Sequence, residues 1–245
     1  MSRPRLEICL DTPAGLAAAV AGGADRIELC AALDSEGLTP APGLMAQAGA
    51  SGCETFALIR SRAGDFVFDA RDLDAMRRDV DAARAAGLAG VVLGASRPDG
   101  RLDERTLGDL IAHAKGLGLG VSLHRAFDVT PDKAEALETA IGLGFQRVLT
   151  SGGRPGAPEG AELIAELIQR AGERIVVMPG AGLEPGNIAD FVRRTGAKEV
   201  HAACRAPLPA PRGGLDAELG FVTPGLQDTS QAVVEAMRQA LEGLG

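Results

Sequence analysis

Two short segments of the chain each carry a carboxylate and a thiol two residues apart. LEIC holds Glu7 and Cys9, and RIELC holds Glu28 and Cys30. In an extended strand, residues i and i+2 point to the same face, so each segment presents the two groups side by side. Thiolates select soft ions such as Cu(I), and carboxylates can transfer protons. Free cysteine also packs as a small apolar side chain, so the pattern leaves both a metal site and a packed core open.

A shared metal site depends on where the strands bring the cysteines. If Cys9 and Cys30 reach the same end of neighbouring strands, their two thiolates could bind Cu(I). Structural zinc sites have four ligands, so His201 or His124 would have to complete a zinc site. Cys204 follows the last expected strand and could join if that strand lies next to the first.

The segment SLHRAFD offers a second set of reactive side chains. We expect a strand to run through it, which places His124 and Asp128 on one face and Arg125 on the other. An imidazole and a carboxylate at a strand end could act as a general acid–base pair, with Glu7 and Glu28 as further catalytic groups. The alternative is a structural network in which a neighbouring carboxylate satisfies the histidine.

Arginines follow the same strand ends. IRSRAGDF places Arg60, Arg62 and Asp65 after the third expected strand, and Arg125 follows the fifth. Guanidinium groups match the geometry of carboxylates and phosphates, so the three arginines could hold an anionic substrate. Salt bridges to Glu7, Glu28 or carboxylates of the loops are an equally good interpretation.

Glycines end the sixth and seventh expected strands, in TSGG and PGAG. Many barrels bind phosphate in this region through backbone N–H groups, which makes Gly152, Gly180 and Gly182 candidate substrate-binding positions. The alternative is that these glycines only permit tight turns.

These groups must be positioned by strands and helices that alternate along the chain. We expect strands at Leu6–Leu10, Arg26–Cys30, Thr55–Arg60, Gly90–Ala95, Gly120–Phe127, Arg147–Thr150, Ile175–Met178 and Glu199–Ala203. The clearest expected helices are Asp69–Ala86, Glu104–Lys115, Pro131–Ile141, Glu159–Ala171, Pro185–Arg194 and Ser230–Leu241. This α/β alternation predicts a parallel sheet with right-handed crossovers. Eight such units fit a single-domain (β/α)8 TIM barrel, with a doubly wound open sheet as the alternative.

Barrel active sites lie at the C-terminal mouth of the strands. We therefore expect Glu7 and Glu28 in the upper interior, with Cys9 and Cys30 one layer nearer the mouth. No change in composition divides the chain, so residues 1–245 are expected to form one domain. Within it, 206–229 is expected to be an irregular loop and 230–243 a C-terminal helix.

Composition excludes several classes of partner. The 245 residues carry a formal charge of −8 and only 3% aromatic residues, which argues against nucleic acid and anionic membrane surfaces. No apolar run has membrane-spanning length. With a first strand expected at Leu6 and four cysteines expected to be reduced, we expect a cytoplasmic protein. The lysines fall outside the expected strand ends, which disfavours a Schiff-base mechanism.

Several blocks of the sequence resemble those of the CutC family, in the same order. They are LEIC, GGADRIELC, GLTP, RAGDF, SLHRAFD, RVLTSG and IVVMPGAG, and they extend from about Leu6 to Arg205. The resemblance implies a (β/α)8 barrel and a role in copper homeostasis. It also implies that Cys9 and Cys30, which match the family's two cysteines, are copper ligands.

The sequence thus supports two functions of different kinds. The first is a cytoplasmic protein that binds Cu(I) through Cys9 and Cys30 in copper homeostasis or tolerance. The alternative is an enzyme that acts on a small anionic, perhaps phosphorylated, metabolite by acid–base chemistry at the barrel mouth. A barrel that only binds a partner protein would need neither site, and a homodimer is compatible with each reading.

Overall fold

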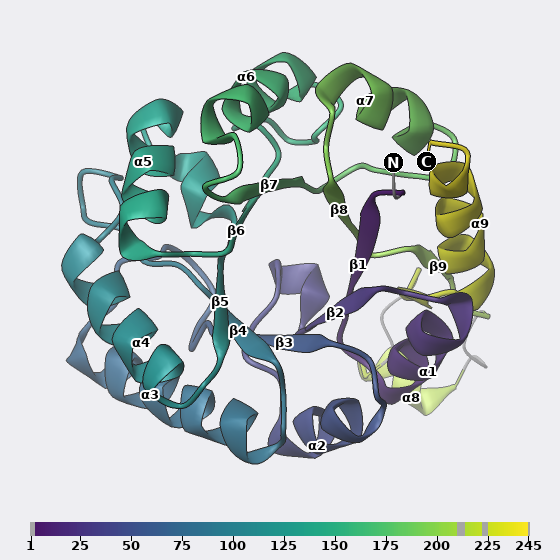
Figure 1. The fold of residues 1–245 in the computed structure, drawn as a ribbon. Coiled ribbons are helices and arrows are strands. Elements are labelled where there is room, and N and C mark those ends of the chain that lie inside the picture. Colours follow the sequence, from purple (N-terminus) through teal and green to yellow (C-terminus); the bar gives the residue numbers. More distant parts are fainter. Residues whose placement is uncertain (1–2, 210–213, 222–224, 245) are drawn as a thin grey trace.

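Eight parallel strands form a nearly closed barrel in the computed structural model, which describes residues 3–209, 214–221 and 225–244 (Figure 1). The strands are β1 (Arg5–Leu10), β2 (Arg26–Leu29), β3 (Thr55–Leu58), β4 (Gly90–Leu93), β5 (Gly120–Leu123), β6 (Arg147–Thr150), β7 (Val176–Pro179) and β8 (Glu199–Ala202). Their hydrogen-bonded order is β7-β6-β5-β4-β3-β2-β1-β8, and β8 lies beside β7. The expected single-domain TIM barrel is confirmed.

Helices cover the outside of the ring (Figure 1). They are α1 (Pro13–Gly22), α2 (Pro42–Ala50), α3 (Ala70–Ala85), α4 (Glu104–Gly116), α5 (Lys133–Leu143), α6 (Ala161–Ala171), α7 (Ile188–Thr195) and α9 (Gln231–Glu242). The α9 helix packs against both α7 and α1, so the C-terminal segment supplies the eighth outer helix. Helical periodicity did not mark α1 and α2, because both are rich in alanine and glycine and lack a polar stripe. No helix among the described residues is long and apolar enough to cross a bilayer.

The pleat of β1 shows how the sequence positions the site. Leu6, Ile8 and Leu10 are fully buried in the large apolar core between the sheet and the helices. Glu7 and Cys9 alternate with them and therefore face the inside of the barrel. Polar side chains at alternate positions are thus the ones that the barrel brings together.

Five strands, β2, β3, β4, β5 and β8, end earlier than expected, and the fifth differs most. It ends at Leu123, and Arg125–Val129 form a 3-10 helix for which His124 is the N-cap. The ring Nδ1 of His124 accepts a hydrogen bond from the backbone N–H of Ala126 at 3.0 Å. The expected arrangement of His124 and Asp128 on one strand face is therefore wrong, because a histidine cap turns the chain out of the sheet.

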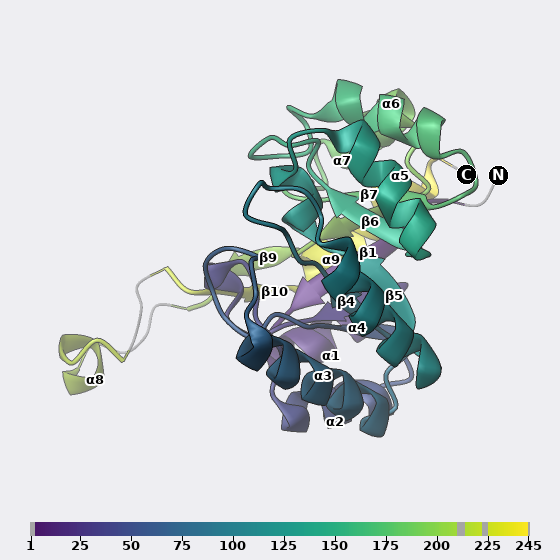
Figure 2. The same cartoon turned by 90° about the vertical axis from the view of Figure 1, so that its left-hand side faces the viewer.

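The segment expected to be irregular, 206–229, is bounded by two paired strands. β9 (Arg205–Pro207) and β10 (Gln227–Thr229) form an antiparallel ribbon, and α8 (Leu215–Glu218) stands away from the barrel (Figure 2). We call the described part of 205–229 the arm. Its exposed large apolar side chains are Leu208, Leu215, Leu219, Phe221 and Leu226. The described residues of α8 therefore add nothing to the core of their own barrel.

Candidate metal and ligand site

A cavity of about 880 Å³ opens at the C-terminal ends of the strands. Its wall includes most of the predicted site residues, namely Cys9, Glu28, Cys30, Arg60, His124, Arg125, Asp128 and Gly182. The remaining predicted positions, Glu7, Arg62, Gly152 and Gly180, are not part of this wall. The volume lies in the range that binds small metabolites.

The register between β1 and β2 decides which groups meet. Cys9 lies opposite Glu28, and Glu7 lies opposite Arg26. We expected Glu7 and Glu28 to lie at one height along the barrel axis and Cys9 and Cys30 together at the next, and this expectation is wrong. Neighbouring barrel strands are staggered by shear, so two copies of one motif need not lie at the same height. Cys30 consequently lies one inward-facing position nearer the mouth than Cys9.

This stagger gathers three possible metal ligands from adjacent strands. The ligand atoms of Cys9 on β1, Glu28 on β2 and His201 on β8 all lie within 4.8 Å of one another, and all three residues are buried. The Nε2 atom of His201 is 3.6 Å from a carboxylate oxygen of Glu28. A thiolate, an imidazole and a carboxylate are established ligands of zinc and copper. We call these three residues the mouth cluster.

Glu7 holds the histidine of the mouth cluster from below. Its carboxylate lies 2.8 Å from Nδ1 of His201, which leaves Nε2 directed toward Glu28. Burial alone would raise the pKa of Glu7, but Arg26 and His201 outweigh it and lower the pKa to about 2. A carboxylate that orients a ligating histidine is a common second partner in metal sites. Its contacts therefore fit a positioning role for Glu7 better than proton transfer in the cavity.

The other members of the mouth cluster are electrostatically coupled. Burial raises the pKa of Glu28 to about 7, with a smaller contribution from Glu7. Burial opposes protonation of His201, but Cys9, Glu7 and Glu28 together raise its pKa well above the usual range. The metal-free cluster thus holds protons that a bound metal ion would displace.

Cys30 lies in a small apolar cluster that also includes Cys9. It is 1% exposed and packs with Phe56, Leu58 and Val92. Burial, followed by the charges of Glu28 and Cys9, raises its pKa well above the usual range. It lines the cavity, so the sequence-based pairing with Cys9 remains a prediction, while its packing is that of a small apolar side chain.

His124 and Asp128 have separate environments. The Asp128 carboxylate accepts hydrogen bonds from Thr150 Oγ1 at 2.6 Å, from the N–H groups of Ser151 and Gly153 at 3.0 Å each, and from Arg125 Nε at 2.9 Å. Burial raises its pKa, but these donors outweigh burial and lower it. Asp128 thus ties the 3-10 helix to the end of β6, and its recorded partners do not include His124.

The predicted arginines differ in what they contact. Arg60 is 6% exposed and donates to the main-chain carbonyls of residues 35, 36, 37 and 64. Arg62 points away from the cavity and pairs with Asp65 and Asp72. Arg125 lines the cavity while paired with Asp128 at 2.9 Å. For Arg62 the contacts are thus the salt bridges that the sequence left open as an alternative.

The predicted glycines mostly serve close packing. A Cβ on Gly180 would lie 2.7 Å from Leu149 and 3.1 Å from His201, so this glycine makes room for the mouth cluster. Gly152 has a φ of +70°, and its Cβ would lie 2.7 Å from the carbonyl oxygen of Gly160. Gly182, with a φ of +72°, lines the cavity and is the one of the three that a ligand could reach.

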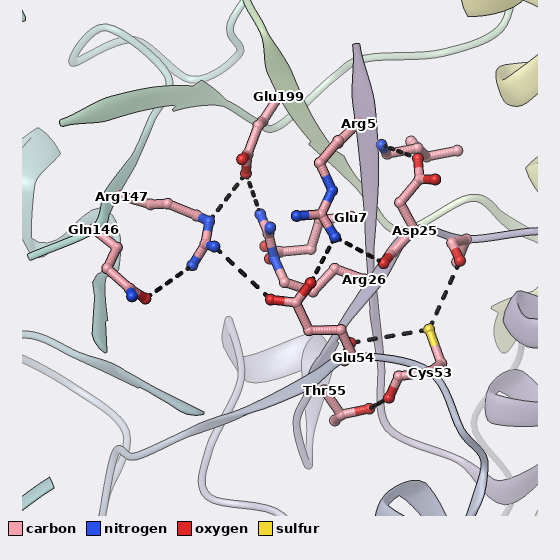
Figure 3. A network of polar contacts seen from close by, with 12 residues as sticks. Arg5, Glu7, Asp25, Arg26, Cys53, Glu54, Thr55, Gln146, Arg147 and Glu199 are labelled. Carbon is pink, nitrogen blue, oxygen red and sulfur yellow. Dashed lines mark hydrogen bonds and ion pairs between the residues drawn. The ribbon is translucent and has the colours of Figure 1, made fainter. Parts of the chain in front are cut away.

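An ionic network below the cavity was not predicted from the sequence (Figure 3). Arg26 is 1% exposed and pairs with Glu7 and Glu199, while Arg147 lies 3.0 Å from Glu199. The guanidinium carbons of Arg26 and Arg147 lie 5.8 and 5.0 Å from the Phe56 ring centre. RIEL and RVLT each offer an arginine at an inward-facing position, which is the signal that could have indicated this network.

Comparison with known proteins agrees with this architecture. The model of the CutC family matches residues 4–206. A family protein CutC of Caulobacter vibrioides is 57% identical over 244 residues, which cover 99% of this chain and 98% of the relative. A family protein CutC of Sinorhizobium medicae is 55% identical over 244 residues, which cover 100% of this chain and 98% of the relative.

Solved structures extend the comparison. CutC from Streptococcus agalactiae, named as a candidate copper homeostasis protein, superposes with a TM-score of 0.77 at 28% identity and covers 82% of this chain and 98% of its own. Thiamine phosphate pyrophosphorylase from Pyrococcus furiosus has a TM-score of 0.59 at 16% identity, with 98% and 96% coverage. At that identity, the likeness to the second protein concerns the fold alone.

Proposed function

The chain belongs to the CutC family, and from this premise and the geometry of the mouth cluster we propose that it binds copper at the barrel mouth and acts in copper homeostasis. The single observation that carries the proposal is the convergence of Cys9, Glu28 and His201 within 4.8 Å on the wall of an open cavity. The name of the Streptococcus agalactiae protein supports copper as the first metal to test.

The donor set fits copper. Thiolate sulfur suits Cu(I), and imidazole suits copper in either oxidation state. We assign the strongest bonds to Cys9 and His201, with Glu28 as a weaker oxygen ligand. Glu7 would hold the ring of His201 in place through Nδ1, and Arg26 would keep Glu7 ionised. The sequence predicted Cys30 as the second copper ligand beside Cys9, so Cys30 is the alternative to His201 at that position.

Anaerobic titration with Cu(I) against a competing chelator tests the proposal. We expect one tightly bound equivalent in the parent, lost in Cys9→Ser and strongly weakened in His201→Gln. Cys53→Ser is the matched control, since Cys53 lies near Ala24 and Glu54 and outside the cavity wall. Loss of binding in Cys30→Ser but not in His201→Gln would restore the two-cysteine site. Equal binding by all variants would refute the copper proposal.

An enzyme acting on a small anionic metabolite remains the second candidate. The observation that favours it is Glu28, because a carboxyl group with a pKa of about 7 can donate or accept protons near neutral pH. His124, also predicted as catalytic, has its pKa lowered to about 3 by burial and by Arg60, so it would act as a neutral hydrogen-bond donor. Turnover that disappears in Glu28→Gln without added metal would favour this candidate.

Cellular context and assembly complete the proposal. The four cysteines are free, which suits a reducing cytoplasm, where we propose that the protein works.

We also propose a homodimer, because the arm exposes five large apolar side chains that its own barrel leaves uncovered. Light scattering should give twice the mass of one chain, and Phe221→Ser with Leu219→Ser should shift the protein toward monomer.

A further inference from the structure

Two buried nitrogen atoms on the β3 and β5 side of the cavity have no hydrogen-bond partner in the part of the chain that the structure describes. They are Nε of Arg60 and Nε2 of His124, in side chains that are 6% and 5% exposed. A buried donor without a partner is costly, and such groups are rare in folded proteins. Both residues line the cavity and follow β3 and β5, whereas the mouth cluster comes from β1, β2 and β8.

The hydrogen bonding of His124 defines what its free nitrogen can do. Nδ1 accepts the N–H of Ala126, so the neutral ring carries its proton on Nε2 and offers a donor there. The ring lies against Gly94, where a Cβ would come within 2.2 Å of it, and the Gly94 backbone interacts only weakly with the ring, so Nε2 has no hydrogen bond of good geometry among the described residues. Gly94 thus makes room for the His124 ring, whose Nε2–H is left available to a ligand.

Arg60 adds a positive charge that, among the described residues, has only the more distant Glu36 carboxylate to balance it. Its recorded hydrogen bonds go to neutral carbonyl oxygens, and the ion pairs of the described residues do not include it. Its guanidinium carbon lies 5.2 Å from the Phe66 ring centre, and the His124 ring lies 4.9 Å from the same centre. One aromatic ring therefore packs against both groups. A buried cation of this kind is stabilised by an anion.

We propose that Arg60 and His124 form an oxyanion subsite that binds the carboxylate or phosphate group of a small metabolite in the mouth cavity. The ligand accepts hydrogen bonds from Nε–H of Arg60 and Nε2–H of His124, beside the Phe66 ring that lines the same cavity. The subsite needs no metal ion, so it stands independently of the copper proposal.

Calorimetric titration of metal-free protein with inorganic phosphate and, separately, with malonate tests the subsite and distinguishes the two ligand classes. His124→Asn is the informative variant, because the asparagine oxygen can replace Nδ1 as the cap of the 3-10 helix while the Nε2 donor is lost. We expect about tenfold weaker binding in this variant, as for a lost hydrogen bond to a charged group. Arg60→Lys, which keeps the charge but loses the Nε donor, should also bind more weakly.

His113→Asn is the matched control, since His113 is half-buried on α4 and pairs with Asp81 instead of lining the cavity. It should bind like the parent. If neither phosphate nor malonate binds the parent, or if His124→Asn binds as tightly as the parent, the subsite is wrong. Because the protein is free of metal throughout, this failure would leave the copper titration unaffected.

Discussion

The two ends of the barrel interior hold buried charges in different ways. Near the N-terminal ends of the strands, Arg26 and Arg147 face carboxylates of Glu7 and Glu199 (Figure 3). Although Nη1 of Arg26 lacks a partner, its other guanidinium nitrogens donate to Glu7, Glu199 and the sulfur of Met178. Each of these groups therefore has an opposite charge beside it.

At the mouth, polar groups are incompletely satisfied. Burial raises the pKa of Glu28 to about 7, Arg60 donates to neutral carbonyls, and His124 keeps one nitrogen unpaired. The contrast teaches that buried charge alone does not mark a functional site. Breaking a buried charge pair is costly, so the lower network is expected to hold the barrel together, whereas we propose that the polar groups at the mouth that lack an opposite charge mark where a ligand or metal binds.

The largest expected effect comes from breaking the lower network. Arg26→Met would remove the guanidinium shared by Glu7 and Glu199 and leave these buried carboxylates with His201 and Arg147 alone, so we expect the free energy of unfolding to fall by about 3–5 kcal/mol. Urea denaturation measures the change. Arg78→Ala is the control, because Arg78 and Asp74 form an exposed pair whose loss should cost less than about 1 kcal/mol. Similar losses in both variants would remove the distinction between the two kinds of charge.

A pH-dependent effect should come from His124. Its pKa is lowered from 6.5 to about 3 in the folded protein, so between these values the unfolded chain binds a proton that the folded chain does not. The contribution of His124 to stability therefore falls as the pH drops from 6.5 to 3, by about 2 kcal/mol at pH 5. Glu28, with its pKa raised to about 7, titrates in the same range and changes stability in the opposite direction, so the test is the difference between two proteins. In urea denaturation the parent should lose about 2 kcal/mol relative to His124→Asn between pH 7 and pH 5. An equal change in the two proteins would mean that His124 is protonated when folded.

The smallest effect is expected at Arg62. Its contacts are with Asp65 and Asp72 on the outside of the cavity, and the pairs are partly exposed. Arg62→Ala should lower stability by less than about 1 kcal/mol and leave phosphate and malonate binding unchanged. Weaker anion binding in this variant would extend the ligand site beyond the cavity wall.

The barrel could be predicted because each strand is a short apolar run and most helices have a polar stripe. The register could not, since Glu7-x-Cys9 and Glu28-x-Cys30 are the same motif and the sequence does not state the shear between their strands. The partners of Asp128 lie 22 to 25 residues further along the chain, and Arg26 meets Glu199 across 173 residues. Contacts so distant in sequence depend on how the barrel closes.

His201 illustrates the same limit within the site. The sequence suggested it only as an additional zinc ligand, because a closed barrel places the last strand beside the first but does not give the register that sets His201 opposite Glu7. Once the barrel closes, His201 pairs with Glu7 and faces Glu28, and its role follows from that geometry.

X-ray absorption spectroscopy of the protein loaded with one equivalent of Cu(I) tests the central claim most directly, because it distinguishes sulfur from nitrogen and oxygen ligands. We predict one sulfur ligand together with imidazole nitrogen, with the sulfur lost in Cys9→Ser and the imidazole signal lost in His201→Gln. Two sulfur ligands without imidazole, unchanged in His201→Gln, would contradict the account and return the site to Cys9 and Cys30.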